Sequence, residues 1–493
     1  MQNKSKGLAP CWRVGVWVLA GLGHFTQSAH AAPKNADGEQ KSPLARIEAL
    51  NPHLVDAEIP NLSLKVASLS KDAYSFFRGT ADLFYVWTRE PCADWLGAKD
   101  QQVILHGDPH PGNTGTFAAH PDGGPRLAYA LVDFDEAFEG PFELDLLRAM
   151  TSLRFAAAEN GLSLSEDAWR GVAEKLVGGY RELWRDIPAK DTDSYRQLEA
   201  LNRANDRVLN TPIVKRLLAK AEKDSVSEYV DKYTKGKPPT HFRKHRGKKN
   251  KIKDVMVRVT PKERDAVMAG FRAAVDRITR KNPESMLPVE TEHEFGPDVR
   301  VLDVARWIRL GSSGSQGLRK YLVLIEPTHA SDHCPRIFQL KEEPACAARR
   351  AGVYVPREET DRGQCVAMSG VWLQRRPQRF VSWTQVDGAH YLMKPKDPFG
   401  KEPDNDDLRT PEALADMAEL MGRLLALGHA PAECLSDSTA LHAAIMRDSL
   451  VGEIDSRSAA CFDALSRDFA AFQKDDRVKA MTRKAEAWLA ERE

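Results

Sequence analysis

The sequence predicts an α+β fold, and three patterns along the chain carry that prediction. Residues 164–230 interleave leucine and alanine with charged residues at helical spacing and contain few helix breakers. After Pro297 the period changes, and short apolar runs bounded by turn residues indicate strands. From Pro411 to the end the pattern is helical again, most clearly in MAELMGRLLALGHA. We therefore expect a helical and mixed first half, a β-rich module and a helical C-terminal region.

Composition limits the class of protein. The chain has 493 residues, with 71 Lys plus Arg against 70 Asp plus Glu, a net charge of +1 and 42% hydrophobic residues. This composition excludes a disordered chain, a collagen-like fibre and a small disulfide scaffold. A protein that mainly holds nucleic acid needs a surplus of basic groups, so no nucleic-acid partner is expected.

Residues 1–31 have the pattern of a cleaved secretory signal. Three basic residues precede or open a short apolar stretch at 14–23, and Ala29-His30-Ala31 supplies the small residues that a signal peptidase reads. The apolar run is too short to span a bilayer comfortably. We therefore expect an exported protein, periplasmic or secreted, with no stable membrane insertion after cleavage.

Six cysteines remain after the signal, an even number for a compartment that is often oxidising. They allow fifteen pairings, and nothing in their spacing chooses between them. No CxxC or His-Cys cluster occurs, so the sequence gives no support for a zinc site.

The first part of the mature chain, residues 32–160, is expected to hold helices around a polar loop. Apolar residues at helical spacing predict a packed helix over 62–87. Apolar runs at 103–105 and 127–132 predict two strands that bracket a Pro/Gly-rich loop. The stretch 143–158 returns to a helical period.

Residues 161–297 are expected to be helical with a basic linker. Ten Lys or Arg residues lie in 232–253, beside Pro238-Pro239 and Gly247. Such a run is usually a solvated loop, although a phosphate-binding role stays open. A further helix is predicted over 262–281.

The β-rich module is expected over residues 298–400, and the C-terminal helical region over 401–493. Three strands are predicted at 301–309, 321–325 and 337–341, joined by turns. Further strands are predicted at 372–374, 380–383 and 391–393.

The densest polar cluster is HGDPHPGN at 106–113, followed by Asp133-Phe134-Asp135. Each member lies at a predicted strand end or in a turn, where a side chain is able to face a cleft. Phosphoryl transfer needs a carboxylate that orients the acceptor hydroxyl and oxygen ligands for magnesium on the nucleotide. Asp108 suits the first task, and Asn113 and Asp133 suit the second. The alternative is a polar turn that only satisfies its own backbone.

These residues match a family pattern. HGDPHPGN followed by LVDFDEAFEGPFELDLLR resembles the catalytic segment of aminoglycoside and choline phosphotransferases, which share the protein kinase-like fold. The resemblance implies that Asp108 is the catalytic base, that Asn113 and Asp133 are metal ligands and that Asp145 is structural. His110 and Asp135 are expected to tune the site, and Arg78 either contacts a phosphate or braces a helix.

A kinase-like site also needs a cradle for the nucleotide phosphates. The candidate lies between two predicted strands, where glycines let the backbone approach an anion: Gly311, Ser312, Ser313, Gly314, Ser315 and Gly317. The strand at 337–340 runs into Lys341, as the third strand of a kinase runs into its phosphate-binding lysine. An ordinary turn and an exposed lysine are the alternatives. Glu359 and Asp361 both remain candidates for the carboxylate that pairs with Lys341.

In ordinary kinases the glycine loop and lysine precede the catalytic segment, whereas here they follow it. This order, with FFRGT at 76–80 and a late LLALGHA helix, resembles the bacterial domain-of-unknown-function family 2252. The resemblance implies a circularly permuted protein kinase-like fold, with a β-rich nucleotide lobe and a larger helical lobe.

The expected activity is phosphoryl transfer from ATP, with Mg²⁺, to an unidentified hydroxyl acceptor that is a small molecule or a protein. Two alternatives remain open: a catalytically inactive kinase-like binding module in the periplasm, and transfer of AMP. A hydrolase that uses the carboxylates directly is a weaker option, because no GxSxG-type nucleophile stands nearby.

Overall fold

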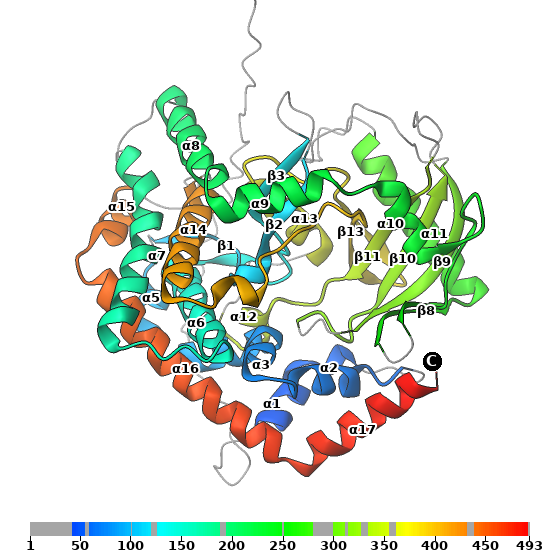
Figure 1. Ribbon diagram of the computed structural model, residues 1–493, viewed down its shortest axis with the longest axis horizontal. Helices are drawn as coiled ribbons and strands as arrows, with labels where there is room; N and C mark the ends of the chain where they lie inside the picture. Colours follow the sequence, from blue (N-terminus) through cyan, green and yellow to red (C-terminus); the bar gives the residue numbers. More distant parts are fainter. Residues whose placement is uncertain are drawn as a thin grey trace, which may run out of the picture. The chain divides into compact units, whose positions relative to one another are not determined.

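A sheet of seven antiparallel strands dominates the second half of the chain (Figure 1). Its strand order is β12-β13-β11-β10-β9-β8-β7. The strands are β7 (His245–Lys248), β8 (Lys251–Arg258), β9 (Arg300–Arg309), β10 (Lys320–Glu326), β11 (Arg336–Glu342), β12 (Ser382–Val386) and β13 (Ala389–Pro395). The α+β prediction is confirmed, because helices make up most of the remaining described structure.

The computed structural model describes eleven stretches of the chain, and residues 42–493 form one unit. The expected signal peptide, residues 1–31, lies outside the described residues. The described stretches are 42–54, 59–99, 101–119, 126–187, 194–248, 251–279, 299–310, 314–326, 334–353, 361–430 and 438–491.

The two faces of the sheet are covered by different helices. α10 (Val226–Tyr233) covers one face, where Tyr233 packs with Trp307, Leu322 and Leu324 in a buried apolar cluster. α11 (Pro261–Thr279) packs on β12, and its Phe271 ring lies 5.4 Å from the ring of Phe338 on β11. Alternation of side chains along each strand separates the two apolar layers.

The face under α10 also carries lysines. Lys320 on β10 pairs directly with Lys341 on β11, and Gln339 pairs with Lys394 on β13. Directly paired residues in an antiparallel sheet project to the same face. Because Leu322 and Leu324 lie two and four residues from Lys320, this face is apolar at one end and cationic at the other.

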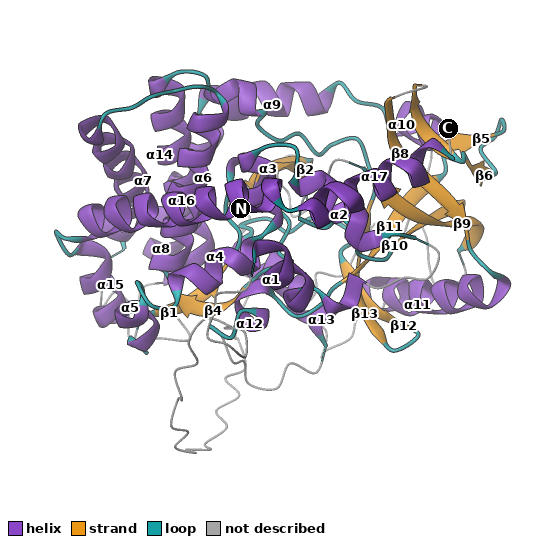
Figure 2. Ribbon diagram, turned by 90° about the horizontal axis from the view of Figure 1, so that it is seen from below, coloured by secondary structure: helices purple, strands orange, loops and turns teal. Residues whose placement is uncertain are grey.

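Long helices form the other main part of the fold (Figure 2). α7 and α14 pack closely side by side, and α16 packs on α6. The helices of this part are α6 (Glu143–Glu159), α7 (Glu166–Asp186), α8 (Ser194–Leu209), α9 (Pro212–Glu222), α14 (Pro411–His429), α15 (Ser438–Met446), α16 (Leu450–Lys474) and α17 (Asp476–Ala490), with a 3-10 turn η3 (Asn405–Leu408).

The single helix predicted over 62–87 is wrong in extent. Asp72 begins a new helix by accepting a hydrogen bond from the Ser75 backbone N–H, and another break falls at Thr80. A capping side chain satisfies a helix end that apolar periodicity does not reveal. The N-terminal helices are α1 (Pro43–Leu50), η1 (Pro52–Leu54), α2 (Asn61–Leu69), α3 (Ala73–Gly79), α4 (Ala81–Thr88) and α5 (Ala93–Gly97).

Two small hairpin-like sheets hold the polar loop. The strands predicted at 103–105 and 127–132 are present as β1 (Gln102–Leu105) and β3 (Leu127–Leu131), but they do not pair with each other. β1 pairs with β4 (Phe138–Pro141), and β3 pairs with β2 (Thr114–Ala118), which follows the 3-10 turn η2 (Pro111–Asn113). The predicted loop therefore contains a strand of its own.

Two further element predictions are wrong. Residues 372–374 are not a strand, because Leu373 ends α13 (Arg362–Leu373), whose N-terminus Asp361 caps. The basic segment 232–253 is not a plain linker. It holds β5 (Thr234–Lys235), β6 (His241–Phe242), β7 and the start of β8. β7 lies at the edge of the sheet, where charged side chains are common because they block further strand pairing. Its sequence is therefore polar and lacks the apolar pattern of a buried strand.

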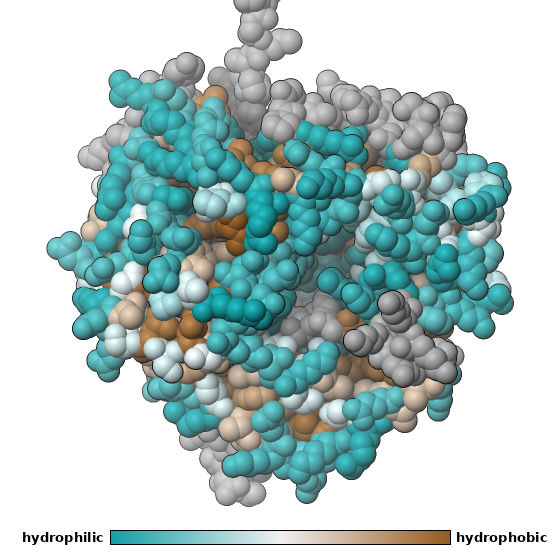
Figure 3. Space-filling view, in the orientation of Figure 1, coloured by the Kyte–Doolittle hydropathy of each residue, from teal (hydrophilic) through white to brown (hydrophobic). Residues whose placement is uncertain are grey.

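The surface of the described structure is typical of a globular protein. The face in Figure 3 is mostly hydrophilic, with apolar residues in small groups, and among the described residues only Leu198 and Trp372 are large apolar residues that are exposed. No disulfide joins any two of the five cysteines that the structure describes. None of the described helices combines the length and the apolar character needed to cross a bilayer.

The contact between α7 and α14 gives a test of the fold. A Cβ added at Gly422 would lie 2.0 Å from the Leu176 backbone oxygen, so Gly422→Ala has to push the helices apart. We expect the free energy of unfolding to fall by about 2–3 kcal/mol in chemical denaturation. Gly178→Ala on α7 is the control, because its Cβ meets nothing within 4 Å, and it should raise stability by about 0.5–1 kcal/mol. Equal effects of the two changes would contradict this packing.

Candidate functional site

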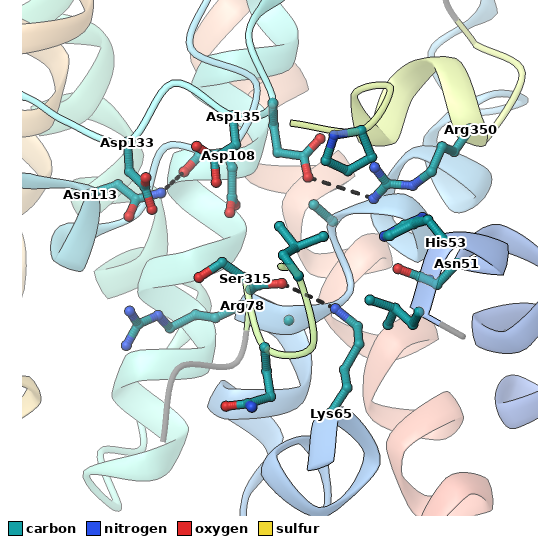
Figure 4. Close-up of a pocket in the computed structure, with 18 of the residues that line it drawn as sticks. Asn51, His53, Lys65, Arg78, Asp108, Asn113, Asp133, Asp135, Ser315 and Arg350 are labelled. Atoms are coloured by element: carbon teal, nitrogen blue, oxygen red, sulfur yellow. Dashed lines mark hydrogen bonds and ion pairs between the residues drawn. The ribbon is translucent and has the colours of Figure 1, made fainter. Parts of the chain in front are cut away.

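A polar pocket lies where the turns after β1 and β3, the N-terminal helices and the β9–β10 loop meet. Figure 4 shows Asp108, Asn113, Asp133 and Asp135 together on one side of it. Four polar residues that the sequence singled out, from two separate segments, therefore face one cavity.

The turn that carries Asp108 is held by Asp145, which lies in the first turn of α6. The buried Asp145 carboxylate accepts hydrogen bonds from the backbone N–H groups of His106 (2.7 Å) and Gly107 (3.0 Å). His429 Nε2 lies 3.1 Å from the same carboxylate, and Tyr180 holds the other nitrogen of that ring at 2.9 Å. A buried carboxylate with this many partners fixes the backbone that it binds.

His106 and Gly107 also fix the local geometry. His106 Nδ1 accepts from the Asp108 backbone N–H, so its Nε2–H donates to the Val132 carbonyl at 2.9 Å. This ring joins the Asp108 turn to the segment before Asp133. Gly107 has φ +82°, and a Cβ there would lie 1.9 Å from the Glu136 backbone oxygen, so only glycine fits.

Asp108 is held by an arginine that the sequence analysis missed. Arg148 on α6 is fully buried, and its Nε and Nη2 lie 2.9 and 2.8 Å from Asp108 Oδ1. Its guanidinium stacks on Phe77 and Phe84 and donates to the Phe77 carbonyl. Arg148 therefore occupies Oδ1 and leaves Oδ2 as the acceptor that faces the pocket. Burial raises the pKa of Asp108 to about 6, although Arg148 acts in the opposite direction.

Asn113 at the end of η2 is oriented by the same turn. Its Nδ2 donates to the Asp108 backbone carbonyl at 3.0 Å. The amide oxygen, which is the metal-binding end of an asparagine, therefore points away from that carbonyl.

Asp133 follows β3 in a left-handed conformation with φ +68°, which is uncommon for a residue other than glycine. Such backbone conformations cluster at functional sites. Its side chain is 40% exposed, and its Oδ1 lies 3.1 Å from Lys341 Nζ and 3.8 Å from Lys394 Nζ. Burial would raise the pKa of Asp133, but these two ammonium groups hold it below its ordinary value. Asp133 is therefore a carboxylate ion at neutral pH.

Lys341 joins the sheet to the loop after β3. It is 2% exposed and forms ion pairs with both Asp133 and Asp135. Of the two partners considered from sequence, Asp361 instead caps α13 and pairs with His390 at 3.0 Å, and Glu359 lies outside the described residues. Asp135, expected only to tune the site, is thus a direct partner of Lys341.

Glu343 is a further carboxylate near Lys341. It follows the last residue of β11, and it is buried with no hydrogen-bond partner for its carboxylate among the described residues. Burial raises its pKa to about 7, against the effect of Lys341.

The glycine-rich loop is described only in part. Gly311, Ser312 and Ser313 lie outside the described residues. Gly314 and Ser315 line the pocket, whereas Gly317, with φ +91°, packs on the Asn61 backbone of α2.

Two lysines that the sequence analysis did not single out bind this loop. Lys320 Nζ donates to Ser315 Oγ at 2.7 Å, and Lys65 on α2 donates to the Gly314 carbonyl at 3.2 Å. The signal for Lys320 was its position directly across from Lys341 in the predicted hairpins. Lys65 gave no signal, because it lies in a run that reads as a packed helix.

His110 and Arg78 also line the pocket. His110 is buried, with Nε2 3.9 Å from Asp108 Oδ2, and burial together with Arg78 and Arg148 holds its pKa well below the ordinary value. It is therefore neutral. Arg78 stacks on Tyr74 and approaches the loop at Gly112, so it both braces α3 and faces the cavity.

A divalent metal has one plausible place in this arrangement. Within the described stretches, no three His, Cys, Asp or Glu side chains gather closely enough to hold a metal by themselves. Magnesium on a nucleotide needs only one or two protein ligands, because phosphates and water fill the remaining positions. The Asn113 amide oxygen and the Asp133 carboxylate supply two oxygen ligands of the kind that magnesium binds.

The buried Lys320 gives a pH-dependent test. Burial lowers its pKa to about 7, so a charged Lys320 destabilises the fold below pH 7, and the penalty disappears as pH rises toward the unfolded pKa near 10. Lys320→Met should therefore be more stable than the wild type at pH 6. Its advantage should shrink by up to about 1.4 kcal/mol per pH unit between pH 7 and 10 in urea unfolding. A stability difference that does not change with pH would contradict this burial.

Comparison with known proteins gives one match. A model of a bacterial family, described as "Uncharacterized protein conserved in bacteria (DUF2252)", matches residues 59–475. No curated protein and no solved structure matches the chain. The match spans most of the chain and includes every pocket residue discussed above. The protein is a member of the DUF2252 family.

Proposed function

We propose that the protein is a kinase-like phosphotransferase that moves the γ-phosphoryl group of Mg-ATP to a hydroxyl acceptor. The observation that carries this proposal is the contact of Lys341 Nζ with Asp133 Oδ1 at 3.1 Å, beside Asp108 and Asn113. A phosphate-binding lysine, two oxygen ligands for magnesium and a carboxylate for the acceptor are the parts that phosphoryl transfer needs.

The order of elements in the sheet supports a kinase-like nucleotide lobe. Protein kinases place a glycine-rich loop over the phosphates, the lysine on the third strand and a helix after it. Here the glycine-rich loop joins β9 to β10, Lys341 lies on β11, and α13 follows before β12. The lobe follows the catalytic segment in the chain, which supports a circular permutation.

The chain's own residues would bind the nucleotide from two sides. Lys341 and Lys320 lie on one face of the sheet, where Lys341 pairs with Asp133 and Lys320 donates to Ser315. Both of these partners line the pocket, as Gly314 does. Asn113 and Asp133 would hold magnesium, which would supply positive charge to offset the negative charge that develops during transfer. The ion pair of Lys341 with Asp133 places the lysine near where those phosphates would bind.

Asp108 would orient the acceptor. Arg148 holds its Oδ1, so Oδ2 is available to accept a hydrogen bond from the acceptor hydroxyl. In the transfer a bond forms between the acceptor oxygen and the γ-phosphorus, and the bond from that phosphorus to the β-γ bridging oxygen breaks. The acceptor proton passes to Asp108, and ADP leaves. An oriented acceptor and a fixed base contribute through positioning and proton transfer.

We further propose export through the N-terminal signal. Cell fractionation checks this: recovery of the processed chain outside the cytoplasm supports export, and a full-length cytoplasmic chain argues against it.

A thermal shift with Mg-ATP tests the nucleotide site. A ligand that binds only the folded state stabilises it by about 2.7 kcal/mol at a hundred times its dissociation constant. We expect millimolar Mg-ATP to raise the melting temperature of the wild type and to have little effect on Lys341→Met. No shift in the wild type would contradict the proposal and favour a binding module that lacks nucleotide.

Asp108→Asn separates binding from chemistry in the same assay. It keeps the hydrogen bond to Arg148 but removes the base, so the Mg-ATP shift should remain. In a screen of hydroxyl acceptors read out as ADP release, its rate should fall by roughly 10²–10⁴-fold. Full activity of Asp108→Asn would exclude Asp108 as the base.

A further inference from the structure

Lys65 is a buried cation that the proposed transfer does not use. It lies on α2, is 5% exposed and lines the pocket. Its ammonium donates to the Gly314 carbonyl, and within the described residues no carboxylate lies within ion-pair distance of it. Buried charges in proteins are almost always paired, because an unpaired one is costly to desolvate. Burial accordingly lowers the pKa of Lys65.

Arg350 and His53 lie at the same corner as Lys65, together with the carboxylates of Asp82 and Glu136, whose charges raise the pKa of Lys65 against the effect of burial. Burial, followed by the charges of Arg350 and Lys65, lowers the pKa of His53 to about 4, so this ring is neutral at physiological pH. Arg350 is only loosely compensated, since its Nη2 lies 3.6 Å from both Asp82 and Glu136. Figure 4 shows Lys65, His53 and Arg350 on the side of the pocket away from Asp133 and Asn113. Because Asp82 and Glu136 both lie near Arg350, Lys65 is the cation at this corner that has no carboxylate within ion-pair distance among the described residues.

The corner belongs to the acceptor side of the pocket. The sheet already supplies Lys341 and Lys320 for nucleotide phosphates, whereas Lys65 comes from a helix outside the sheet. Asp108, which would orient the acceptor hydroxyl, lines the same cavity as Lys65. An acceptor whose hydroxyl reaches Asp108 would therefore place its other end near Lys65.

We propose that the acceptor is a small hydroxyl compound carrying an anionic group, a phosphate or a carboxylate, that Lys65 binds with Arg350 and His53 beside it. This inference rests on the proposed phosphotransferase function.

Calorimetric titration of the full chain with inorganic phosphate, in the presence of saturating Mg-AMP-PNP, tests the anion site. We expect the wild type to bind phosphate and Lys65→Met to bind it at least about tenfold more weakly, because a charge-assisted hydrogen bond is lost. Lys65→Arg should retain most of the affinity. Lys396→Met is the matched control, because Lys396 is a buried lysine that bonds Tyr229 outside the pocket, and it should leave phosphate binding unchanged.

Thermal unfolding checks that the Lys65→Met variant still folds. Replacing an unpaired buried charge by an apolar side chain is often neutral or stabilising, so the melting temperature of Lys65→Met should be unchanged or higher. Inorganic phosphate should raise the melting temperature of the wild type and not that of Lys65→Met.

Turnover assays with glycerol, glyceric acid and glycerol 3-phosphate identify the source of the anion. Preference for either charged compound over glycerol, lost in Lys65→Met through a higher KM, supports the proposal and tells phosphate from carboxylate.

Three outcomes would overturn the proposal: no phosphate binding by the wild type, unchanged binding in Lys65→Met, or an equal loss of Mg-AMP-PNP affinity in that variant. The last result would mean that Lys65 binds the nucleotide and not the acceptor. Phosphate binding through Lys65 without any binding of Mg-AMP-PNP would instead support the anion site and contradict the phosphotransferase function.

Discussion

The ion pair between Lys341 and the carboxylates of Asp133 and Asp135 is the interaction on which the site depends. It joins the seven-stranded sheet to the loop after β3, two segments about two hundred residues apart in the chain. Lys341 is buried, so removing either carboxylate would leave a charge with incomplete compensation, which is strongly destabilising in proteins. The same contact sets the position of the sheet lysines relative to Asp108 and Asn113. Every chemical assignment in the cleft therefore follows from this one contact.

The carboxyl groups of Asp108 and Asp133 differ in pKa because their surroundings differ. Burial raises the pKa of Asp108 to about 6, while Lys341 and Lys394 hold the pKa of Asp133 below its ordinary value. A pair of titratable groups whose pKa values are pushed apart is typical of a site with separate acid-base and ligand roles. Asp145 takes no part in this chemistry, but it fixes the backbone of the Asp108 turn. The pocket thus combines a rigid backbone with side chains of different charge states.

Sequence patterns singled out residues that line one pocket in the structure, whereas several elements around that pocket differ from the prediction. Fixed spacing in HGDPHPGN and VDFD identified Asp108, Asn113 and Asp133, because turn residues at strand ends leave a local signature. The strand that ends near Lys341 was also visible as an apolar run. The partners of these residues were not visible, because they depend on tertiary contacts: Arg148 reads as one charge in a helix, and Lys65 as one polar residue in an apolar run. The helix break at Asp72 was missed because a capping side chain begins a new helix without interrupting the apolar periodicity. The edge strand β7 was missed because the charged residues of an edge strand hide the apolar alternation that indicates a strand.

The most direct test of the account is a crystal structure of the protein with magnesium and AMP-PNP. The account predicts metal density at Asn113 and Asp133, with the phosphates within hydrogen-bond distance of Lys341 and the γ-phosphate facing Asp108. A nucleotide bound elsewhere, or a cleft in which Lys341 keeps both carboxylates and no phosphate enters, would contradict it.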